Sequence, residues 1–189
     1  MIGLRLYIFD MGGVVSRFID AIPLISRHLD IDNEALINTA REEFDLLTEG
    51  RITTRTFWDR FSCRSGKPVV EELFGKFFKP ALDPLVVGLI ERLKKSSRVV
   101  CGTNTIEPHY EIHQRLGHYG IFHAVYASHR MGVAKPDPEF FRFILEAEET
   151  AAAEAFFIDD DEKNVLSARG LGMESVHFKD PSALIQRIG

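Results

Sequence analysis

The sequence has few cysteines, no basic excess and no long hydrophobic run, and each shortage excludes a class of protein. Its two cysteines, Cys63 in a polar stretch and Cys101 in an apolar run, make neither a disulfide framework nor a zinc-binding spacing, which fits a reducing compartment. The 23 Lys and Arg residues are outnumbered by 28 Asp and Glu residues and form no basic block, so we expect no nucleic-acid partner. Arg5 and Asp10 interrupt the N-terminal apolar stretch, and no apolar run reaches about 18 residues, so we expect no signal peptide, no membrane span and a cytoplasmic location.

Apolar residues make up 45% of the 189 residues, enough for one globular core with room for an insertion. Short apolar runs alternate with segments whose apolar residues recur at helical spacing, a pattern typical of strand-helix-strand units around a parallel sheet. Strand sequences such as YIFD and AFFIDD are apolar on both faces, which predicts helices on both sides of the sheet. We therefore expect an α/β fold, with strands at 4–9, 98–102, 123–127, 155–158 and 175–178 and helices at 84–95, 107–117, 138–147 and 162–170.

The alternation stops between residues 17 and 80. No strand pattern occurs there, and the apolar spacing predicts three or more helices, over 33–47, 53–61 and 69–78. A glycine-rich turn near Gly13 and the proline-bordered stretch 80–84 flank this segment. We expect an all-helical domain at 17–80, inserted after the first strand of a core that consists of residues 1–16 and 81–189.

Polar side chains stand at or just after the ends of several predicted strands, where an open parallel sheet binds its ligands. A carboxylate there can attack phosphorus, provided that a hard cation such as Mg²⁺ and a nearby ammonium neutralise the repulsion between carboxylate and phosphate. A hydroxyl and backbone N–H groups can hold a phosphoryl oxygen. The candidates for these tasks are Asp10 as nucleophile, Asp159 and Asp160 as metal ligands, Lys135 as the cation and Thr103 as the hydroxyl.

Each of these residues also has a purely structural interpretation. A lone aspartate after a strand often begins a turn, and a lone threonine there often serves structure, so Asp10 and Thr103 gain weight only from the joint pattern. The string GVAKPDPEFF is more specific than a lone lysine. For Asp161 and Glu162 we prefer the structural interpretation, in which they complement the dipole at the start of a helix.

The order FDMGG, CGTN, GVAKPDP and IDDDEKN resembles the four motifs of the haloacid dehalogenase-like hydrolases, and the resemblance covers most of the chain. The helical insertion lies where that superfamily carries its cap domain, and LTEGRITTRTFW is similar to a cap stretch of its subfamily I. The resemblance implies a Rossmann-like core. It makes Asp10 the nucleophile, Thr103 the phosphate-binding hydroxyl and Lys135 the family's lysine.

The resemblance also implies a magnesium site. Asp160 becomes a direct ligand, Asp159 supports the ion through water, and the backbone carbonyl of Gly12 binds it beside Asp10. Asn164 takes the family's later polar position. The expected contacts with the phosphorylated substrate are Thr103, Asn104, Lys135, Gly12 and Gly13.

Gly12 stands where the family's phosphatases usually carry a second aspartate, which protonates the leaving group and later activates water. Because such general acid–base help is worth about 10²–10⁴ in rate, we expect a slow enzyme, a substrate with a good leaving group or a substitute acid. His109, which follows TNTIEP, is one candidate for the substitute. The motif resembles the Asp-x-Gly branch that includes sugar-phosphate phosphatases acting on α-D-glucose 1-phosphate.

These motifs favour an Mg²⁺-dependent phosphatase that acts on a small phosphorylated metabolite. One alternative is a 2-haloacid dehalogenase, which also lacks the second aspartate but uses no Mg²⁺; the acid pair Asp159 and Asp160 disfavours it, because a carboxylate-rich site repels a haloacid anion. The other alternative, motivated by Gly12, is a protein that keeps the fold and binds a phosphorylated ligand or a partner without useful turnover. The sequence does not indicate an oligomeric state.

Two further groups of residues carry weaker expectations. Phe44, Glu49, Arg51 and Trp58 are candidates to line the substrate pocket from the inserted domain, although aromatic residues at helical spacing more often belong to a core. His109 and His113 have helical i, i+4 spacing without an HExxH string, which favours a solvated helix face over a metal site.

Overall fold

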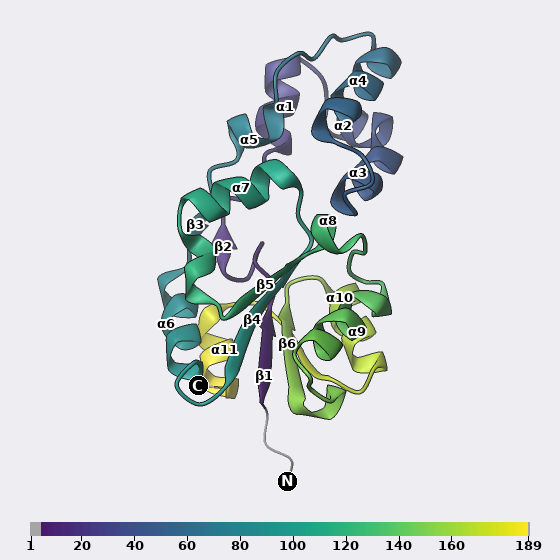
Figure 1. The fold of residues 1–189 in the computed structure, drawn as a ribbon. Coiled ribbons are helices and arrows are strands. Elements are labelled where there is room, and N and C mark those ends of the chain that lie inside the picture. Colours follow the sequence, from purple (N-terminus) through teal and green to yellow (C-terminus); the bar gives the residue numbers. More distant parts are fainter. Residues whose placement is uncertain (1–4, 189) are drawn as a thin grey trace.

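The apolar runs pair into one five-stranded sheet with the order β5-β4-β1-β6-β7, and every neighbouring pair is parallel (Figure 1). In this computed structural model, which describes residues 5–188, the strands are Leu6–Phe9 (β1), Arg98–Thr103 (β4), Ala124–Ala127 (β5), Ala155–Asp159 (β6) and Glu174–His177 (β7). The predicted α/β fold with a Rossmann-like parallel sheet is confirmed. Residue 4 of the first predicted strand lies outside the described residues.

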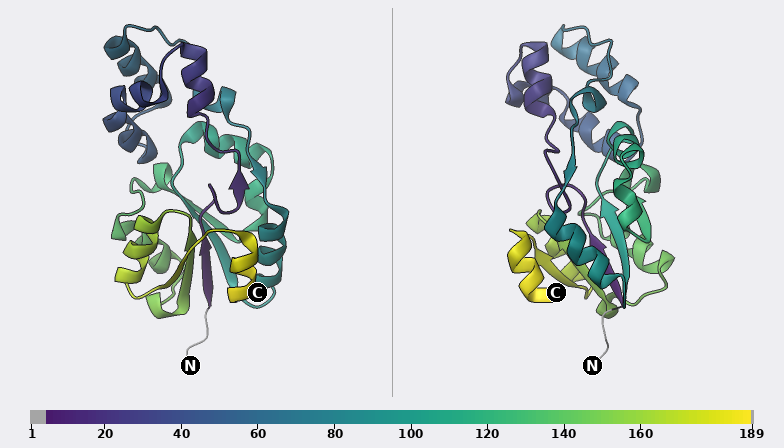
Figure 2. Two further views of the ribbon diagram at one scale, coloured as in Figure 1. Left: turned by 180° about the vertical axis from the view of Figure 1, so that it is seen from behind. Right: turned by 90° about the vertical axis from the view of Figure 1, so that its left-hand side faces the viewer.

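Helices cover both faces of the sheet, as the two-faced apolar strands require (Figures 1 and 2). In β1, Tyr7 and Phe9 pack into the core beneath α6 and α11, whereas Leu6 and Ile8 pack into the core beneath α9 and α10. These helices are Pro84–Leu93 (α6), Pro181–Ile188 (α11), Pro138–Ala147 (α9) and Glu162–Gly170 (α10). Helix α11, which begins at a proline beyond the last predicted strand, was not expected.

Further short helical elements complete the core. They are Glu107–Arg115 (α7), His118–Ile121 (η1), Ser128–Met131 (α8) and Ala152–Glu154 (η2). The helices that follow the site loops begin on aspartates: Asp137 accepts a hydrogen bond from the N–H of Glu139, and Asp161 accepts one from the N–H of Lys163. The structural interpretation of Asp161 is therefore confirmed.

Five helices between residues 22 and 77 form a separate unit with its own apolar core, which we call the cap (Figure 1). They are Ile22–Leu29 (α1), Asn33–Thr39 (α2), Arg41–Thr48 (α3), Thr54–Ser65 (α4) and Leu73–Phe77 (α5). The stretch 33–47, in a segment expected to hold three or more helices, divides into α2 and α3, because the backbone breaks at Ala40, where φ is −123°. The break lets Leu36 of α2 and Leu47 of α3 both enter the cap core. Helix α1 was not expected.

A two-stranded ribbon joins the cap to the core. Ser16–Arg17 (β2) pairs antiparallel with Ala81–Leu82 (β3), and the N–H of Asp83 donates to the carbonyl of Val15 at 2.9 Å. Arg17 and Asp83 also form an ion pair across the ribbon. The chain therefore leaves and re-enters the core at one place, and the domain division predicted at 16/17 and 80/81 passes through this ribbon. Residues 1–4 and 189 of the predicted core lie outside the described range.

Candidate active site

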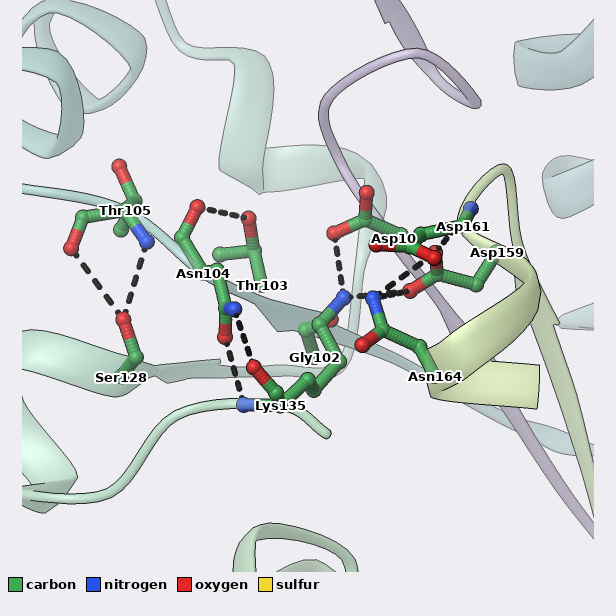
Figure 3. Close-up of polar contacts among 10 residues, drawn as sticks. All are labelled: Asp10, Gly102, Thr103, Asn104, Thr105, Ser128, Lys135, Asp159, Asp161 and Asn164. Atoms are coloured by element: carbon green, nitrogen blue, oxygen red, sulfur yellow. Dashed lines mark hydrogen bonds and ion pairs between the residues drawn. The ribbon is translucent and has the colours of Figure 1, made fainter. Parts of the chain in front are cut away.

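Lys135 lies at the centre of a buried charge cluster at the carboxyl edge of the sheet (Figure 3). Its Nζ donates to Asp10 Oδ1 and to Asp159 Oδ2 at 2.7 Å each, and to the carbonyl of Gly102 at 2.9 Å. Asp10 follows β1, Gly102 belongs to β4 and Asp159 ends β6, so three adjacent strands converge on one ammonium. The parallel sheet thus brings together residues up to 125 positions apart in the chain.

Asp159 is held in place from a second side. The Nδ2 of Asn164 donates to both carboxylate oxygens at 3.1 Å, and the N–H of Asp161 donates to Oδ1 at 2.8 Å (Figure 3). Asn164 comes from the first turn of α10, so the helix start fixes the carboxylate. With these partners and Lys135, the buried Asp159 has the hydrogen bonds that a buried charge requires.

A third carboxylate, Asp160, completes a group whose chemistry fits a hard cation. Oxygen atoms of Asp10, Asp159 and Asp160 lie within 4.8 Å of one another. Gly13 makes this approach possible, because its φ is +75° and a Cβ there would collide with the Asp160 carboxylate. Three carboxylates against one ammonium leave excess negative charge, and carboxylate oxygens are the donors that Mg²⁺ prefers.

The electrostatics of the cluster show the same excess of negative charge. Burial raises the pKa of Asp10 to about 7, because the opposing effect of Lys135 is outweighed by desolvation and by the charge of Asp159. Burial also raises the pKa of Asp160, with a further contribution from Asp159. For Lys135, burial alone lowers the pKa, but its two carboxylate partners outweigh burial and raise the pKa above its usual value. A cation bound beside these carboxylates would favour their charged forms.

Thr103 and Asn104 follow each other at the end of β4 but make different contacts. Thr103 is buried, and its hydroxyl lies 3.4 Å from the carbonyl oxygen of Asn104. The Asn104 side chain spans two loops, since its Nδ2 donates to the carbonyl of Lys135 and its Oδ1 accepts from the N–H of Lys135, both at 2.8 Å. Asn104 thus fixes the backbone that carries Lys135, and it also lines the cavity between the cap and the core, so its expected contact with the substrate stays a prediction.

The space next to Gly12 is occupied by an apolar side chain. A Cβ added to Gly12 would lie 2.9 Å from Cδ1 of Ile19, which comes from the segment that leads into the cap. Ile19 therefore stands beside the position where a second aspartate would begin. Sequence reasoning did not single out Ile19, because an isoleucine carries no chemical signature of a site.

A cavity of about 570 Å³ lies between the cap and the core, and Lys135 is one of the residues that line it. Of the four cap residues proposed from the sequence, Phe44 and Glu49 line this cavity. Arg51 is not among the described lining residues, but its side chain donates a hydrogen bond to Glu49 at 3.1 Å. Trp58 is 2% exposed within the cap core, so its expected place in the pocket is wrong.

The two histidines of α7 do not form a solvated helix face. His113 is buried and its Nδ1 lies 2.9 Å from Nδ1 of His118, while the ring of His109 stacks on Phe78 with centroids 3.8 Å apart. The expectation fails because the sequence does not show that α5 and η1 pack against this helix. His109 lines the cavity, but burial lowers its pKa to about 4, which leaves it without a proton to donate near neutral pH.

A parallel sheet whose strand ends gather carboxylates and a lysine beneath a helical cap defines a class, the capped α/β hydrolases. The chain belongs to the haloacid dehalogenase-like hydrolase family, which matches residues 4–172. This finding confirms the resemblance noted in the sequence at the level of the superfamily and its hydrolase activity. The finer resemblance to the Asp-x-Gly sugar-phosphatase branch stays a prediction.

Individual relatives add detail. The chain is 30% identical over 186 residues to the sesquiterpene phosphatase astK of Aspergillus oryzae, covering 93% of this chain and 90% of that protein. It is 32% identical over 124 residues to the drimenol cyclase drtB of Aspergillus calidoustus, covering 63% of this chain and 23% of that protein. Among solved structures, an Asp-to-Ala mutant of the enzyme BT-2542 from Bacteroides thetaiotaomicron, in complex with magnesium and inorganic phosphate, superposes with a TM-score of 0.83 at 25% identity, covering 97% of this chain and 99% of that one.

None of the helices between residues 5 and 188 combines the length and the apolar character needed to cross a membrane.

Proposed function

We propose that this hydrolase cleaves a phosphate monoester through a phosphorylated Asp10, with Mg²⁺ as its cofactor. The observation that carries the proposal is the position of Lys135 Nζ, 2.7 Å from both Asp10 and Asp159, beside the carboxylate of Asp160. The likeness to a protein named as a phosphatase and to an enzyme solved with magnesium and inorganic phosphate supports it.

In the proposed reaction, a carboxylate oxygen of Asp10 forms a bond to phosphorus while the ester P–O bond breaks, and the leaving oxygen takes up a proton to become an alcohol. Water then cleaves the acyl phosphate, which restores the Asp10 carboxylate and releases inorganic phosphate. Lys135 holds Asp10 in position and balances its charge, and the Thr103 hydroxyl with the neighbouring backbone N–H groups binds phosphoryl oxygens.

The carboxylates of Asp10 and Asp160 and the backbone carbonyl of Gly12 are the groups that we assign to Mg²⁺, with Asp159 supporting it. When bound, the ion offsets the repulsion between the carboxylates and the phosphoryl group. Asn164 keeps the supporting carboxylate oriented through its two 3.1 Å contacts.

The proposal is tested by measuring phosphate release from a panel of phosphate monoesters with Mg²⁺ and with a chelator. The panel includes sugar phosphates, in view of the sequence resemblance, and hydrophobic esters, in view of the name of the relative astK. We expect release to need Mg²⁺ and to fall by about 10³-fold or more in Asp10→Asn, which keeps the shape but loses the nucleophile. Asp180→Asn, at the exposed start of α11, is the matched control and keeps the activity. Equal release by wild type and Asp10→Asn contradicts the proposal.

Gly12, with Ile19 beside it, is compatible with two other functions, because neither of them needs a second aspartate. The same experiment tests both. Chloride release from 2-chloropropionate without added metal identifies a dehalogenase. A protein that releases nothing from any compound, while a phosphorylated ligand still raises its melting temperature, is a binding protein.

A further inference from the structure

We infer that the substrate is the phosphate ester of a hydrophobic alcohol, of the alkyl or isoprenoid class, whose hydrocarbon chain lies in the cavity between the cap and the core. This inference rests on the proposed function, and it names the part of the substrate that leaves.

Apolar side chains make up about half of the residues that line the cavity. They come from separate parts of the chain, namely the segment before α1, α1 itself, α3, α5, the loop after β4 and the loop after Lys135. Examples from these segments are Ile19, Ile22, Phe44, Phe74, Ile106 and Pro136. The volume of about 570 Å³ falls in the range, about 300–1,000 Å³, that encloses an organic ligand of moderate size. The apolar part of the wall favours a hydrocarbon, because a sugar buried against it would leave hydroxyl groups without hydrogen-bond partners.

The apolar wall begins next to the reacting group. Lys135 lines the cavity and its Nζ is 2.7 Å from Asp10, so the phosphoryl group at Asp10 lies at the end of the cavity. Ile19 lines the cavity too, and its Cδ1 is 2.9 Å from the place of a Cβ on Gly12. The first carbons beyond the ester oxygen therefore meet an isoleucine where related enzymes have a carboxylate.

The charges around the cavity exclude a second anionic group on the substrate. Four carboxylates line it: Asp20, Asp45, Glu49 and Asp137. Within the described lining, Lys135 is the only lysine or arginine, and its charge is already matched by Asp10 and Asp159. A second phosphate or a carboxylate on the leaving group would be repelled, whereas an uncharged hydrocarbon is not.

The apolar path continues out of the cavity along the cap. A second groove of about 380 Å³ shares Ile22, Phe44 and Asp45 with the cavity and adds Ile37 and Arg41. Ile37 is 40% exposed, so the groove presents apolar surface to solvent. A hydrocarbon chain too long for the cavity can therefore extend into this groove and remain in contact with apolar side chains.

The first experiment measures binding, because binding does not depend on turnover. Butyl-, octyl- and dodecylphosphonate, whose C–P bond cannot be hydrolysed as an ester, are titrated calorimetrically into the protein with Mg²⁺, below their micelle concentrations. We expect the affinity to rise by about two- to fourfold for each added CH₂ group until the cavity is filled. Phosphocholine is included because the four carboxylates also suit a cation.

Two variants on α1 test where the hydrocarbon chain of the ligand lies. Ile22→Asn places an amide in the cavity wall and is expected to flatten the dependence on chain length, costing dodecylphosphonate about tenfold in affinity. Leu24→Asn makes the same kind of change two residues on, at a site that is 41% exposed and outside the described lining, and keeps the wild-type dependence. Equal effects of the two variants would overturn the assignment of the chain to this cavity.

The second experiment compares kcat/KM for farnesyl phosphate and glucose 1-phosphate, with an expected preference for the former of about 10²-fold or more. Phosphate release that depends on Asp10 but favours the sugar or phosphocholine, together with affinities independent of chain length, overturns the inference and leaves the proposed function standing. A chain-length dependence without phosphate release from any ester supports the inference as a binding site and overturns the proposed function.

Discussion

The edge of the core sheet and the wall of the cap carry different kinds of side chain. At the sheet edge, Asp10 and Asp159 are buried and each accepts a hydrogen bond from Lys135 at 2.7 Å, so small movements are costly (Figure 3). The cap wall presents apolar side chains such as Ile22 and Phe44, whose contacts are not directional. In the proposed function, the strand ends determine the reaction. The cap, which joins the core through the ribbon of β2 and β3, selects the leaving group.

The two regions also meet at a second place, far from the ribbon. Ser128 Oγ of the core lies 2.7 Å from the carbonyl of Thr48, which ends α3 of the cap. Gly50 lies directly against the backbone of His129, and a Cβ at Gly50 would collide with that carbonyl. These contacts close the cap over the cavity, because they lie on the opposite side from β2 and β3 (Figure 1).

Removing the central cation should damage the core site most. Lys135→Met leaves Asp10 and Asp159 buried without their shared partner, so we expect the phosphatase activity to fall by about 10²–10³-fold. The free energy of unfolding should fall by about 3–5 kcal/mol, because breaking a buried ion pair leaves uncompensated charge. Phosphate release and urea unfolding followed by circular dichroism measure the two effects.

A double variant separates these effects. Lys135→Met with Asp159→Asn removes one of the two facing carboxylates, so part of the lost stability should return while the activity stays low. A double variant that regained activity would show that Lys135 serves stability alone.

The missing acid can be restored in a way that tests the boundary between the two regions. Gly12→Asp alone places its Cβ 2.9 Å from Ile19 Cδ1, whereas Gly12→Asp with Ile19→Ala provides room. We expect the double variant to cleave esters of poor leaving groups about 10–10² times faster than wild type, since it regains general acid catalysis. Rates on an ester with a good leaving group, such as p-nitrophenyl phosphate, should change little. Ile19→Ala alone is the control and should gain nothing on poor leaving groups.

The sequence predicted the sheet and the polar edge because both have local signatures. Strands such as β1 are apolar on both faces, and Asp10, Lys135 and Asp160 stand in strings with recognisable spacing. It did not predict Ile19 beside Gly12 or the burial of His113, because neither depends on the local pattern. Both positions are set when the cap and α7 pack against distant segments, and a single sequence contains no periodicity that reports such packing.

A glycine pair tests whether the cap must close for the reaction. Gly50 and Gly66 both have positive φ, +68° and +69°, so replacement by alanine costs each about 1 kcal/mol of backbone strain. Only at Gly50 does the new Cβ also meet the core, at the backbone of His129, whereas nothing lies within 4 Å of a Cβ at Gly66. We expect Gly50→Ala to raise KM about tenfold and Gly66→Ala to leave it unchanged. Equal values of KM would mean that this contact does not position the cap.

The smallest expected effect concerns the histidines of α7, which lies beside α5 of the cap. Burial, with contributions from His118 and His109, lowers the pKa of His113 from 6.5 to about 3. Its contribution to stability is therefore complete above about pH 6.5 and is lost as the pH falls toward 3, because the unfolded chain takes up the proton first. Between about pH 7 and pH 5, we expect wild type to lose about 1–2 kcal/mol more of its free energy of unfolding than His113→Gln, which cannot be protonated. Urea unfolding at the two pH values measures this difference, with His28→Gln at an exposed site of α1 as the control. Asp10 and the other carboxylates contribute equally to wild type and variant, so their effects cancel in this comparison. Equal losses of free energy of unfolding in wild type and His113→Gln would show that His113 is accessible to protons in the folded protein.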